Sequence, residues 1–264
     1  MVYKPVAVST KRILISNDDG INAPGIAILE RIAHALSDDV WVIAPEEEQS
    51  GAGHSLTLTK PLRIRKLEEK RWAVAGTPTD CIMLAVNKIM ADHLPTLILS
   101  GINRGGNLAE DVTYSGTVSV AMEGTLVGIP SIALSQCIRP NERTKWATAE
   151  QYATDVIKSL LSAGWPKDVL MNINFPAFSP GEIKGVKVTE QGRREMVGVG
   201  IEERIDPRGF KYYWLGLGRD VGTPGQQTDV KSVREKWISV TPIKMDMTDH
   251  SARDQLLPFI DKSF

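Results

Sequence analysis

The sequence predicts an α/β protein with a Rossmann-like, mostly parallel sheet and flanking helices. Short apolar runs at residues 13–16, 40–44 and 96–100 have the length and the bordering turn residues of buried strands. Between the first two runs, apolar side chains recur at helical spacing over residues 24–36. A strand, a helix and a strand in this order form a right-handed unit with two parallel strands, so most of the sheet is expected to be parallel.

The remaining elements of the core follow the same two patterns along the chain. Further strands are expected at residues 62–65, 72–74, 129–135, 169–175 and 238–242. Further helices are expected at residues 78–90, 118–126, 144–163 and 228–237, with a short helix and tail over 251–264. Capping residues are expected before two of these helices: Thr77, for which Asp80 has the spacing of a capping-box partner, and Ser115.

The pattern changes near residue 180. Segments 185–190, 196–205 and 210–215 alternate in polarity and are separated by glycines, which is typical of hairpins. The expected organisation therefore has four parts. They are a loose tail (1–11), an α/β core that carries the active site (12–178), a protruding β-hairpin extension (179–225) and a C-terminal strand and helix that complete the core (226–264).

The composition sets broad limits on the function. The chain has 264 residues, of which 42% are hydrophobic and 24% charged, and a net charge of -1. Lys and Arg are spread along the sequence, so no nucleic-acid polymer is expected as a partner. There is no signal-like apolar region at the N-terminus and no run as long as a membrane span. Two cysteines without CxxC spacing, Cys81 and Cys137, fit a reducing compartment. These features predict a cytoplasmic protein that does not bind membranes.

Two adjacent carboxylates follow the first predicted strand, in Asn17-Asp18-Asp19-Gly20. Open parallel sheets bind ligands beyond the carboxyl ends of their strands, and paired carboxylates at that place suit Mg²⁺ or Mn²⁺. The same residues are also good turn formers, because Asp bonds its own backbone and Gly accepts a positive φ. From this stretch alone, a turn and a metal site are equally good interpretations.

Two other loops are expected at the same edge of the sheet. The loop over residues 45–55 brings Ser50, and the loop after residue 100 brings Asn103. With Asp18 and Asp19 these side chains offer four oxygen ligands, which favour a hard cation over zinc. Beside them, Ser115-Gly116-Thr117 opens a helix whose N-terminus favours an anion such as phosphate. A divalent cation and an anion site together indicate phosphoryl transfer.

Several long motifs make the sequence resemble the SurE family of metal-dependent nucleotidases and phosphatases. The matching motifs, in chain order, are ILISNDDGINAPGI, VIAPEEEQSGAGHSLTLTKPL, GTPTDC, SGINRGGNLAEDVTYSGTVSVAMEG and PSIALS, with a weaker match in ISVTPIKMDMT. The resemblance runs from about residue 12 to about residue 135. It implies hydrolysis of nucleoside 5′- and 3′-monophosphates, in some members also of short polyphosphate, by dimers or tetramers that form through a hairpin and an exchanged C-terminal segment.

The resemblance also implies roles for single residues. It assigns one divalent cation per subunit, Mg²⁺ or Mn²⁺, to Asp18, Asp19, Ser50 and Asn103. It assigns the substrate phosphate to Ser115, Gly116 and Thr117. Asn107 is a further candidate for a contact with the phosphate. Many family members have a basic residue directly before the serine that corresponds to Ser50. The present chain has Gln49 there, so an extra cation beside the phosphate is in doubt.

Some alternatives remain open at the level of the sequence. His54 is a candidate general acid or phosphate ligand, but a loop histidine with a structural hydrogen bond is the more common situation. For Arg104, a phosphate ligand and a solvated surface side chain are equally good interpretations. Asp18 or Asp19 is either the group that holds the metal and accepts a proton from water, or a nucleophile that forms an aspartyl-phosphate. A nucleotide-binding module without turnover gains little from two carboxylates, and a dinucleotide oxidoreductase lacks its GxGxxG motif.

Overall fold

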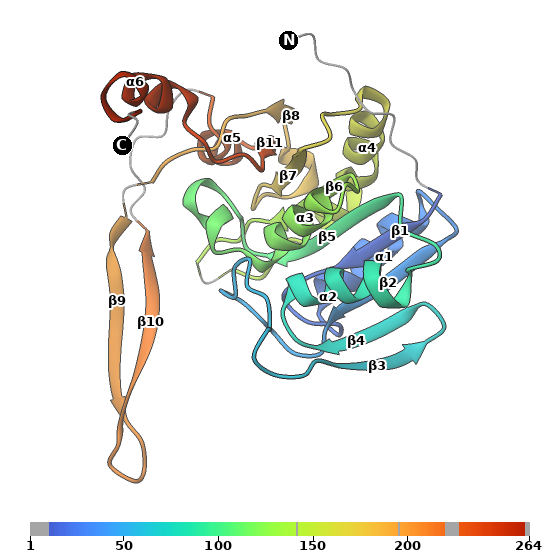
Figure 1. Ribbon diagram of the computed structural model, residues 1–264, viewed down its shortest axis with the longest axis horizontal. Helices are drawn as coiled ribbons and strands as arrows, with labels where there is room; N and C mark the ends of the chain where they lie inside the picture. Colours follow the sequence, from blue (N-terminus) through green and yellow to red (C-terminus); the bar gives the residue numbers. More distant parts are fainter. Residues whose placement is uncertain (1–10, 141, 195, 220–226, 262–264) are drawn as a thin grey trace.

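A nine-stranded sheet forms the centre of the computed structural model, which describes residues 11–140, 142–194, 196–219 and 227–261 (Figure 1). The strand order is β3-β4-β2-β1-β5-β6-β7-β11-β8. Pairings between β4 and β7 across the middle of the sheet are all parallel, which confirms the predicted fold class. The strands are β1 (Ile13–Ser16), β2 (Val40–Pro45), β3 (Arg63–Glu68), β4 (Arg71–Ala75), β5 (Leu97–Arg104), β6 (Ser131–Gln136), β7 (Val169–Phe175), β8 (Gly185–Val188) and β11 (Trp237–Lys244).

Helices cover both faces of this sheet. On one face, α1 (Pro24–His34) and α4 (Ala147–Ala163) pack in one apolar cluster with Ile13 and Ile15 of β1. On the other, α2 (Pro78–Leu84), the π-helical turn Ala85–Ile89 and α3 (Gly116–Leu126) contribute to clusters that include Leu14 of the same strand and Ala133 of β6. Because successive strand residues point to opposite faces, a continuous apolar run is what a strand with two covered faces requires.

The two predicted helix caps are confirmed, whereas some helix bounds differ: α4 begins at Ala147 rather than at residue 144, and α3 begins at Gly116 rather than at residue 118. Thr77 and Asp80 form the capping box of α2, and the Ser115 hydroxyl accepts a hydrogen bond from the Val118 N–H at the start of α3. The helix expected over residues 228–237 is α5 (Asp229–Arg234), and Trp237 already belongs to β11. The helix ends early because the chain reverses at Lys236, which has a φ of 71°.

The segment at residues 185–190 was expected to form part of the hairpin extension. This expectation is wrong, because the strand within it belongs to the main sheet. Residues Gly185–Val188 form β8, which pairs in parallel with β11 at the edge of the main sheet. An edge strand with one exposed face has the same period-two pattern as a hairpin strand, so the sequence does not separate the two. The hairpin itself consists of β9 (Met196–Ile205) and β10 (Lys211–Arg219), which form their own sheet and project from the core (Figure 1).

The order of the central strands creates a crevice at one point. From β1 the chain moves to β2 on one side and later returns to β5 on the other side. Such a reversal of direction separates the loops at the carboxyl ends of the two strands and is where open α/β sheets bind ligands. The loops after β1, β2 and β5 all begin at this crevice, as the sequence predicts.

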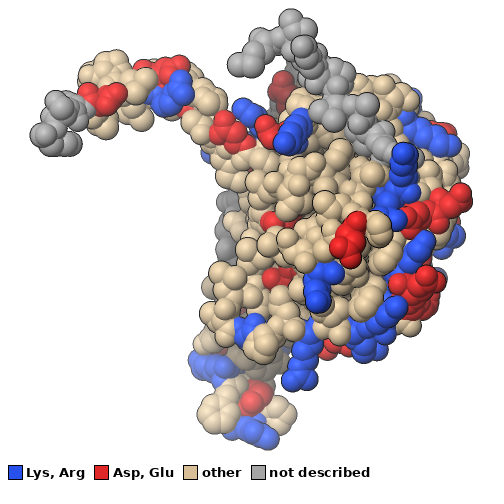
Figure 2. All heavy atoms as spheres, turned by 45° about the vertical axis from the view of Figure 1, so that its right-hand side comes forward, with Lys and Arg blue, Asp and Glu red and all other residues tan. Residues whose placement is uncertain are grey.

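The surface shows no large area of one charge on the face seen in Figure 2, where Lys and Arg are interspersed with Asp and Glu. Several of these charges form ion pairs, such as Arg31 with Glu150 and Arg65 with Glu46. The helices among the described residues include none that is long and apolar enough to cross a membrane. The last helix, α6 (His250–Ile260), has no buried residue.

Candidate active site

The paired carboxylates lie in a tight turn directly after β1. The side-chain amide of Asn17 donates to the Gly20 carbonyl at 2.8 Å, and Gly20 has a φ of +98°, which favours glycine. The turn therefore exists as its residue types suggest. It places Asp18 in a buried position, with 4% of its surface exposed, and leaves Asp19 half-buried.

Asp18 lies against the N-terminus of α3. The hydroxyl and the backbone N–H of Thr117 both donate to its carboxylate. Burial raises the pKa of Asp18 to about 6, the Thr117 hydroxyl opposes this rise, and the negative charge of Asp19 adds to it. Gly116 permits the close approach, because a Cβ at that position would lie 2.6 Å from the Asp18 Cβ. The helix N-terminus thus stabilises the charged form of a carboxylate that burial disfavours.

Asp19 points to the carboxyl end of β5. One of its oxygens accepts a hydrogen bond of 3.1 Å from the backbone N–H of Arg104. Burial raises the pKa of Asp19, and this hydrogen bond partly opposes the rise. Neither Asp18 nor Asp19 has an ion pair among the described residues. Two carboxylates with raised pKa values at one crevice favour a bound cation.

The neutral candidate ligands are Ser50, in the loop after β2, and Asn103, which was expected in a loop but lies within the last residues of β5. Ser50 is exposed, and its hydroxyl donates to Glu48 at 2.8 Å. Its neighbour Gln49 donates a backbone hydrogen bond of 2.7 Å to the Asp18 carbonyl, which fixes the Ser50 loop to the carboxylate turn. The Asn103 amide nitrogen donates to the Gly105 carbonyl at 3.0 Å, so its oxygen is the atom that remains to coordinate a cation.

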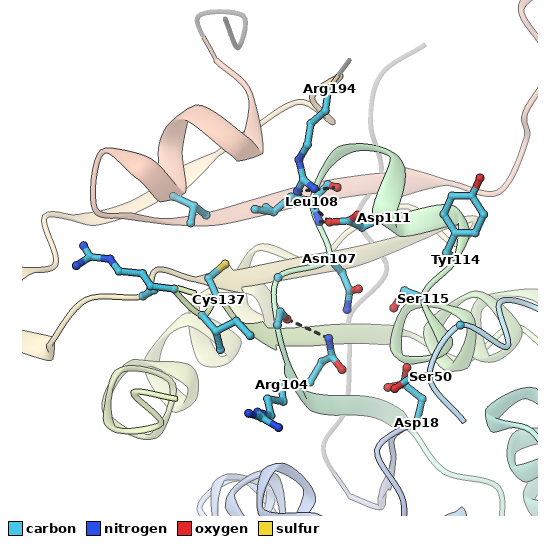
Figure 3. A pocket seen from close by; sticks show the side chains of 18 of the residues that line it. Asp18, Ser50, Arg104, Asn107, Leu108, Asp111, Tyr114, Ser115, Cys137 and Arg194 are labelled. Atoms are coloured by element: carbon cyan, nitrogen blue, oxygen red, sulfur yellow. Dashed lines mark hydrogen bonds and ion pairs between the residues drawn. The ribbon is translucent and has the colours of Figure 1, made fainter. Parts of the chain in front are cut away.

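A pocket of about 570 Å³ opens at this crevice (Figure 3). The predicted residues Asp18, Ser50, Asn103, Asn107 and Ser115 line it. Asp19, Gly116, Thr117 and His54 are not among its lining residues. The structure therefore brings oxygen atoms from the turn after β1, the loop after β2 and the carboxyl end of β5 to one end of a single pocket. Gly116 and Thr117 lie behind Asp18 rather than on the pocket wall.

The sequence matches a known family model and named relatives over most of its length. The family model described as Survival protein SurE matches residues 13–198. This chain belongs to the SurE family. It is 56% identical over 239 residues to 5′-nucleotidase SurE of Parvibaculum lavamentivorans, covering 90% of this chain and 86% of that protein. It is 56% identical over 251 residues to 5′-nucleotidase SurE of Paramagnetospirillum magneticum, covering 94% and 95%.

A solved structure of the SurE family has the same fold. The crystal structure of the SurE protein from Aquifex aeolicus superimposes with a TM-score of 0.80 at 40% sequence identity. The match covers 94% of this chain and 98% of that chain. The fold is therefore shared over nearly the entire length, and the family resemblance predicted from the motifs is confirmed.

Asn107 is held from several sides in this SurE-family pocket. Its side-chain amide donates to the Ser135 hydroxyl at 2.8 Å, and its backbone N–H donates to the Asn174 side-chain oxygen at 2.8 Å. The side-chain amides of Asn172 and Asn174 donate to its carbonyl at 2.8 and 3.1 Å. The sequence contained a signal for this arrangement, because two asparagines at period two in the strand of residues 169–175 must share one buried face.

His54 lies away from the pocket in this structure. Its Nε2 atom is 2.9 Å from a Glu123 carboxylate oxygen on α3. Nearby, the Thr57 N–H donates to Asp80 at 2.9 Å and the Thr77 hydroxyl donates to the Ser55 carbonyl at 2.7 Å. The contacts favour the structural interpretation of His54, as part of the attachment of the Ser50 loop to α2 and α3.

The other end of the pocket was not predicted from the sequence. It is formed by residues after β6, after β7 and on α5, which are far apart along the chain. The lining residues at this end are Cys137, Ile138, Arg139, Ala177, Phe178, Val233 and Arg234. A usable signal was that residues 137–139 and 177–178 also follow strands of the parallel part of the sheet, so their loops reach the same edge as Asp18.

Proposed function

We propose that this chain is a metal-dependent phosphomonoesterase that hydrolyses nucleoside 5′- and 3′-monophosphates, and also short-chain polyphosphate. The observation that carries the proposal is the pair Asp18 and Asp19 beside a pocket at the reversal point of the sheet. The names of the relatives, 5′-nucleotidase SurE, support the same activity. A nucleoside monophosphate is the expected partner, with its phosphate at the Asp18 end of the pocket.

The donor atoms at this end suit one Mg²⁺ or Mn²⁺ per subunit. Among the residues that the structure describes, no three of His, Cys, Asp and Glu are placed so that they could hold a metal ion together. The set Asp18, Asp19, Ser50 and Asn103 instead combines two charged and two neutral oxygens, which is the chemistry of hard cations. When bound, such a cation neutralises phosphate charge and lowers the pKa of a bound water.

The chain's own residues orient the substrate and the carboxylates. Thr117 fixes the position of Asp18, and the Arg104 backbone fixes Asp19. Ser115 and Asn107 line the pocket next to them and are proposed to contact the phosphate oxygens. Asn107 is suited to this task because its hydrogen bonds prevent it from moving when charge develops on the phosphate.

We also propose that the protein is a cytoplasmic homodimer or homotetramer that assembles through its hairpin and C-terminal helix. One face of the hairpin carries exposed apolar side chains, because Ile201 pairs with Leu215 and Tyr213 and Ile205 lie on the same face. On α6, Phe259 and Ile260 are about 70% exposed. Apolar surface of this kind is typical of subunit interfaces.

Phosphate release tests the proposed activity. Purified protein is incubated with adenosine 5′-monophosphate, the 3′-isomer or short polyphosphate, in EDTA or with Mg²⁺ or Mn²⁺. We expect phosphate release with metal and little in EDTA. Absence of release from any substrate with either metal would show that the proposed function is wrong. Asp18→Asn and Asp19→Asn are compared with Asp38→Asn, which removes an exposed carboxylate away from the pocket. Full activity in both site variants would disprove the site assignment.

A further inference from the structure

We propose that the second end of the pocket binds the nucleobase, which stacks on the guanidinium plane of Arg139. This inference rests on the proposed function and names the part of the pocket that recognises the substrate beyond its phosphate. The pocket is continuous from Asp18 to Arg139 and Phe178, so one ligand can occupy both ends. In Figure 3 Cys137 lies across the pocket from Asp18 and Ser50.

The order of the strands sets the distance between the two ends. Along the carboxyl edge, the strands follow one another as β1, β5, β6 and β7. Asp18 follows β1, Arg139 follows β6 and Phe178 follows β7. Neighbouring strands are about 4.8 Å apart, so the base end lies on the order of 10–14 Å from the carboxylate end. That span fits a phosphate, a ribose and a base in extended order.

Two adjacent glycines form part of the pocket wall. Gly105 and Gly106 line the pocket and follow β5, which lies between β1 and β6 in the sheet. A Cβ at Gly106 would lie 2.7 Å from the Cys137 sulfur, and Gly105 has a φ of +129°. Both positions therefore require glycine, and together they leave a low surface on which a sugar can lie between the phosphate and the base.

Arg139 is held in place before any ligand binds. Its guanidinium carbon is 4.2 Å from the centroid of the Phe178 ring, and one of its nitrogens is 3.5 Å from Glu142. The Lys236 ammonium is 4.8 Å from the same ring. An arginine fixed by stacking and an ion pair loses little freedom on binding, which makes its plane a prepared surface for a flat ligand.

The surroundings of Arg139 fit a base face better than a base edge. Ile138, Ala177 and Val233 line the same end and are apolar. Stacking on an arginine plane beside apolar side chains accepts any base, because every base has a flat face. We therefore expect weak discrimination among bases, with purine nucleotides preferred over pyrimidine nucleotides because their larger rings cover more of this surface.

The test compares a substrate that has a base with one that lacks it. Arg139→Ala is expected to lower kcat/KM for adenosine 5′-monophosphate by roughly tenfold, mainly through KM. The same variant should hydrolyse ribose 5-phosphate at the wild-type rate, which also shows that it is folded. Arg143→Ala removes an exposed arginine outside the pocket and should change neither reaction. Adenosine should inhibit ribose 5-phosphate hydrolysis, with an inhibition constant that rises roughly tenfold in Arg139→Ala.

Arg139→Lys separates stacking from charge. Lysine keeps the positive charge but lacks the plane, so the lysine variant should remain as deficient with adenosine 5′-monophosphate as the alanine variant. Restoration by lysine, or equal losses with both substrates, would show that Arg139 acts on phosphate and would overturn the base assignment. An unchanged KM in Arg139→Ala would overturn it as well, while phosphate release by the wild type would leave the proposed function intact. If the wild type hydrolyses neither substrate, both proposals fail.

Discussion

Asp18 and Asp39 are carboxylates at opposite edges of the same sheet, and their surroundings are opposite too. At the carboxyl edge, burial raises the pKa of Asp18 to about 6. At the amino edge, Asp39 accepts hydrogen bonds from Arg12 at 2.6 Å, Lys70 at 2.8 Å and the Trp41 indole at 2.9 Å. Although partial burial acts to raise the pKa of Asp39, these partners lower it. At the amino edge, cationic side chains of the protein thus neutralise the charge of Asp39. At the carboxyl edge, the charge of Asp18 is left for a ligand to neutralise.

This difference separates residues that stabilise the fold from residues that serve the reaction. A buried, ionised carboxylate without a cationic partner destabilises the folded state. Its presence is therefore explained by function rather than by stability. A paired carboxylate needs no such explanation. The comparison predicts that substitutions at the two edges affect different properties, and the following experiments test that separation.

The largest effect is expected for the carboxylates at the crevice. Asp18→Asn and Asp19→Asn should each lower kcat/KM for nucleoside monophosphates by roughly 10²–10³-fold, because each removes charge at the point where phosphate charge must be balanced. Asp39→Asn should retain wild-type activity. The measurement is initial-rate phosphate release at saturating metal. A comparable loss of activity in Asp39→Asn would remove the distinction between the two edges.

Metal binding should stabilise the folded protein through the crevice alone. At a metal concentration of one hundred times Kd, Mg²⁺ or Mn²⁺ should add about 2.7 kcal/mol to the free energy of unfolding. Urea unfolding in EDTA and in added metal measures this increment. We expect the full increment in Asp39→Asn and most of it to be absent in Asp18→Asn. An equal increment in all three proteins would place the cation elsewhere.

A change behind the carboxylate should have an intermediate effect. In Gly116→Ala the new Cβ would lie 2.6 Å from the Asp18 Cβ and 2.9 Å from one of its oxygens, so Asp18 must move. We expect the free energy of unfolding to fall by about 1–3 kcal/mol. We expect kcat/KM to fall by an amount that corresponds to a similar loss of transition-state stabilisation. Gly181→Ala is the matched control, because a Cβ there meets nothing within 4 Å. Wild-type kcat/KM in Gly116→Ala would show that the position of Asp18 is not critical.

The smallest effect is expected at the amino edge. Because the folded pKa of Asp39 lies below its usual value of 3.8, this group stabilises the fold above that pH. The contribution is lost as the pH falls through the folded pKa. Asp39→Asn should therefore lower the free energy of unfolding by about 1 kcal/mol or less at pH 7 and have less effect near pH 3. A loss that does not change with pH would contradict the ion-pair explanation.

The predictable part of the molecule was the part that local sequence encodes. Asp18 was found because it follows an apolar strand and enters a turn, and Asn103 because it lies at the carboxyl end of another apolar strand. The helix cap at Ser115 has a local signal of its own. The positions of Arg139, Phe178 and Asn174 depend on β6 lying beside β5 and on β7 lying beside β6, which tertiary packing decides. For the same reason β8 could not be distinguished from a hairpin strand, since either partner gives one exposed face.

The projecting hairpin has a consequence for how the protein responds to dilution. A two-stranded hairpin is marginally stable in water on its own, and β9 and β10 pair only with each other among the described strands. If its apolar face is covered by another subunit, each dissociation exposes that face and removes its support. Thermal unfolding should then occur at a lower temperature as the protein is diluted roughly hundredfold. An unfolding temperature that does not change with protein concentration would instead show that the hairpin is stable without a second subunit.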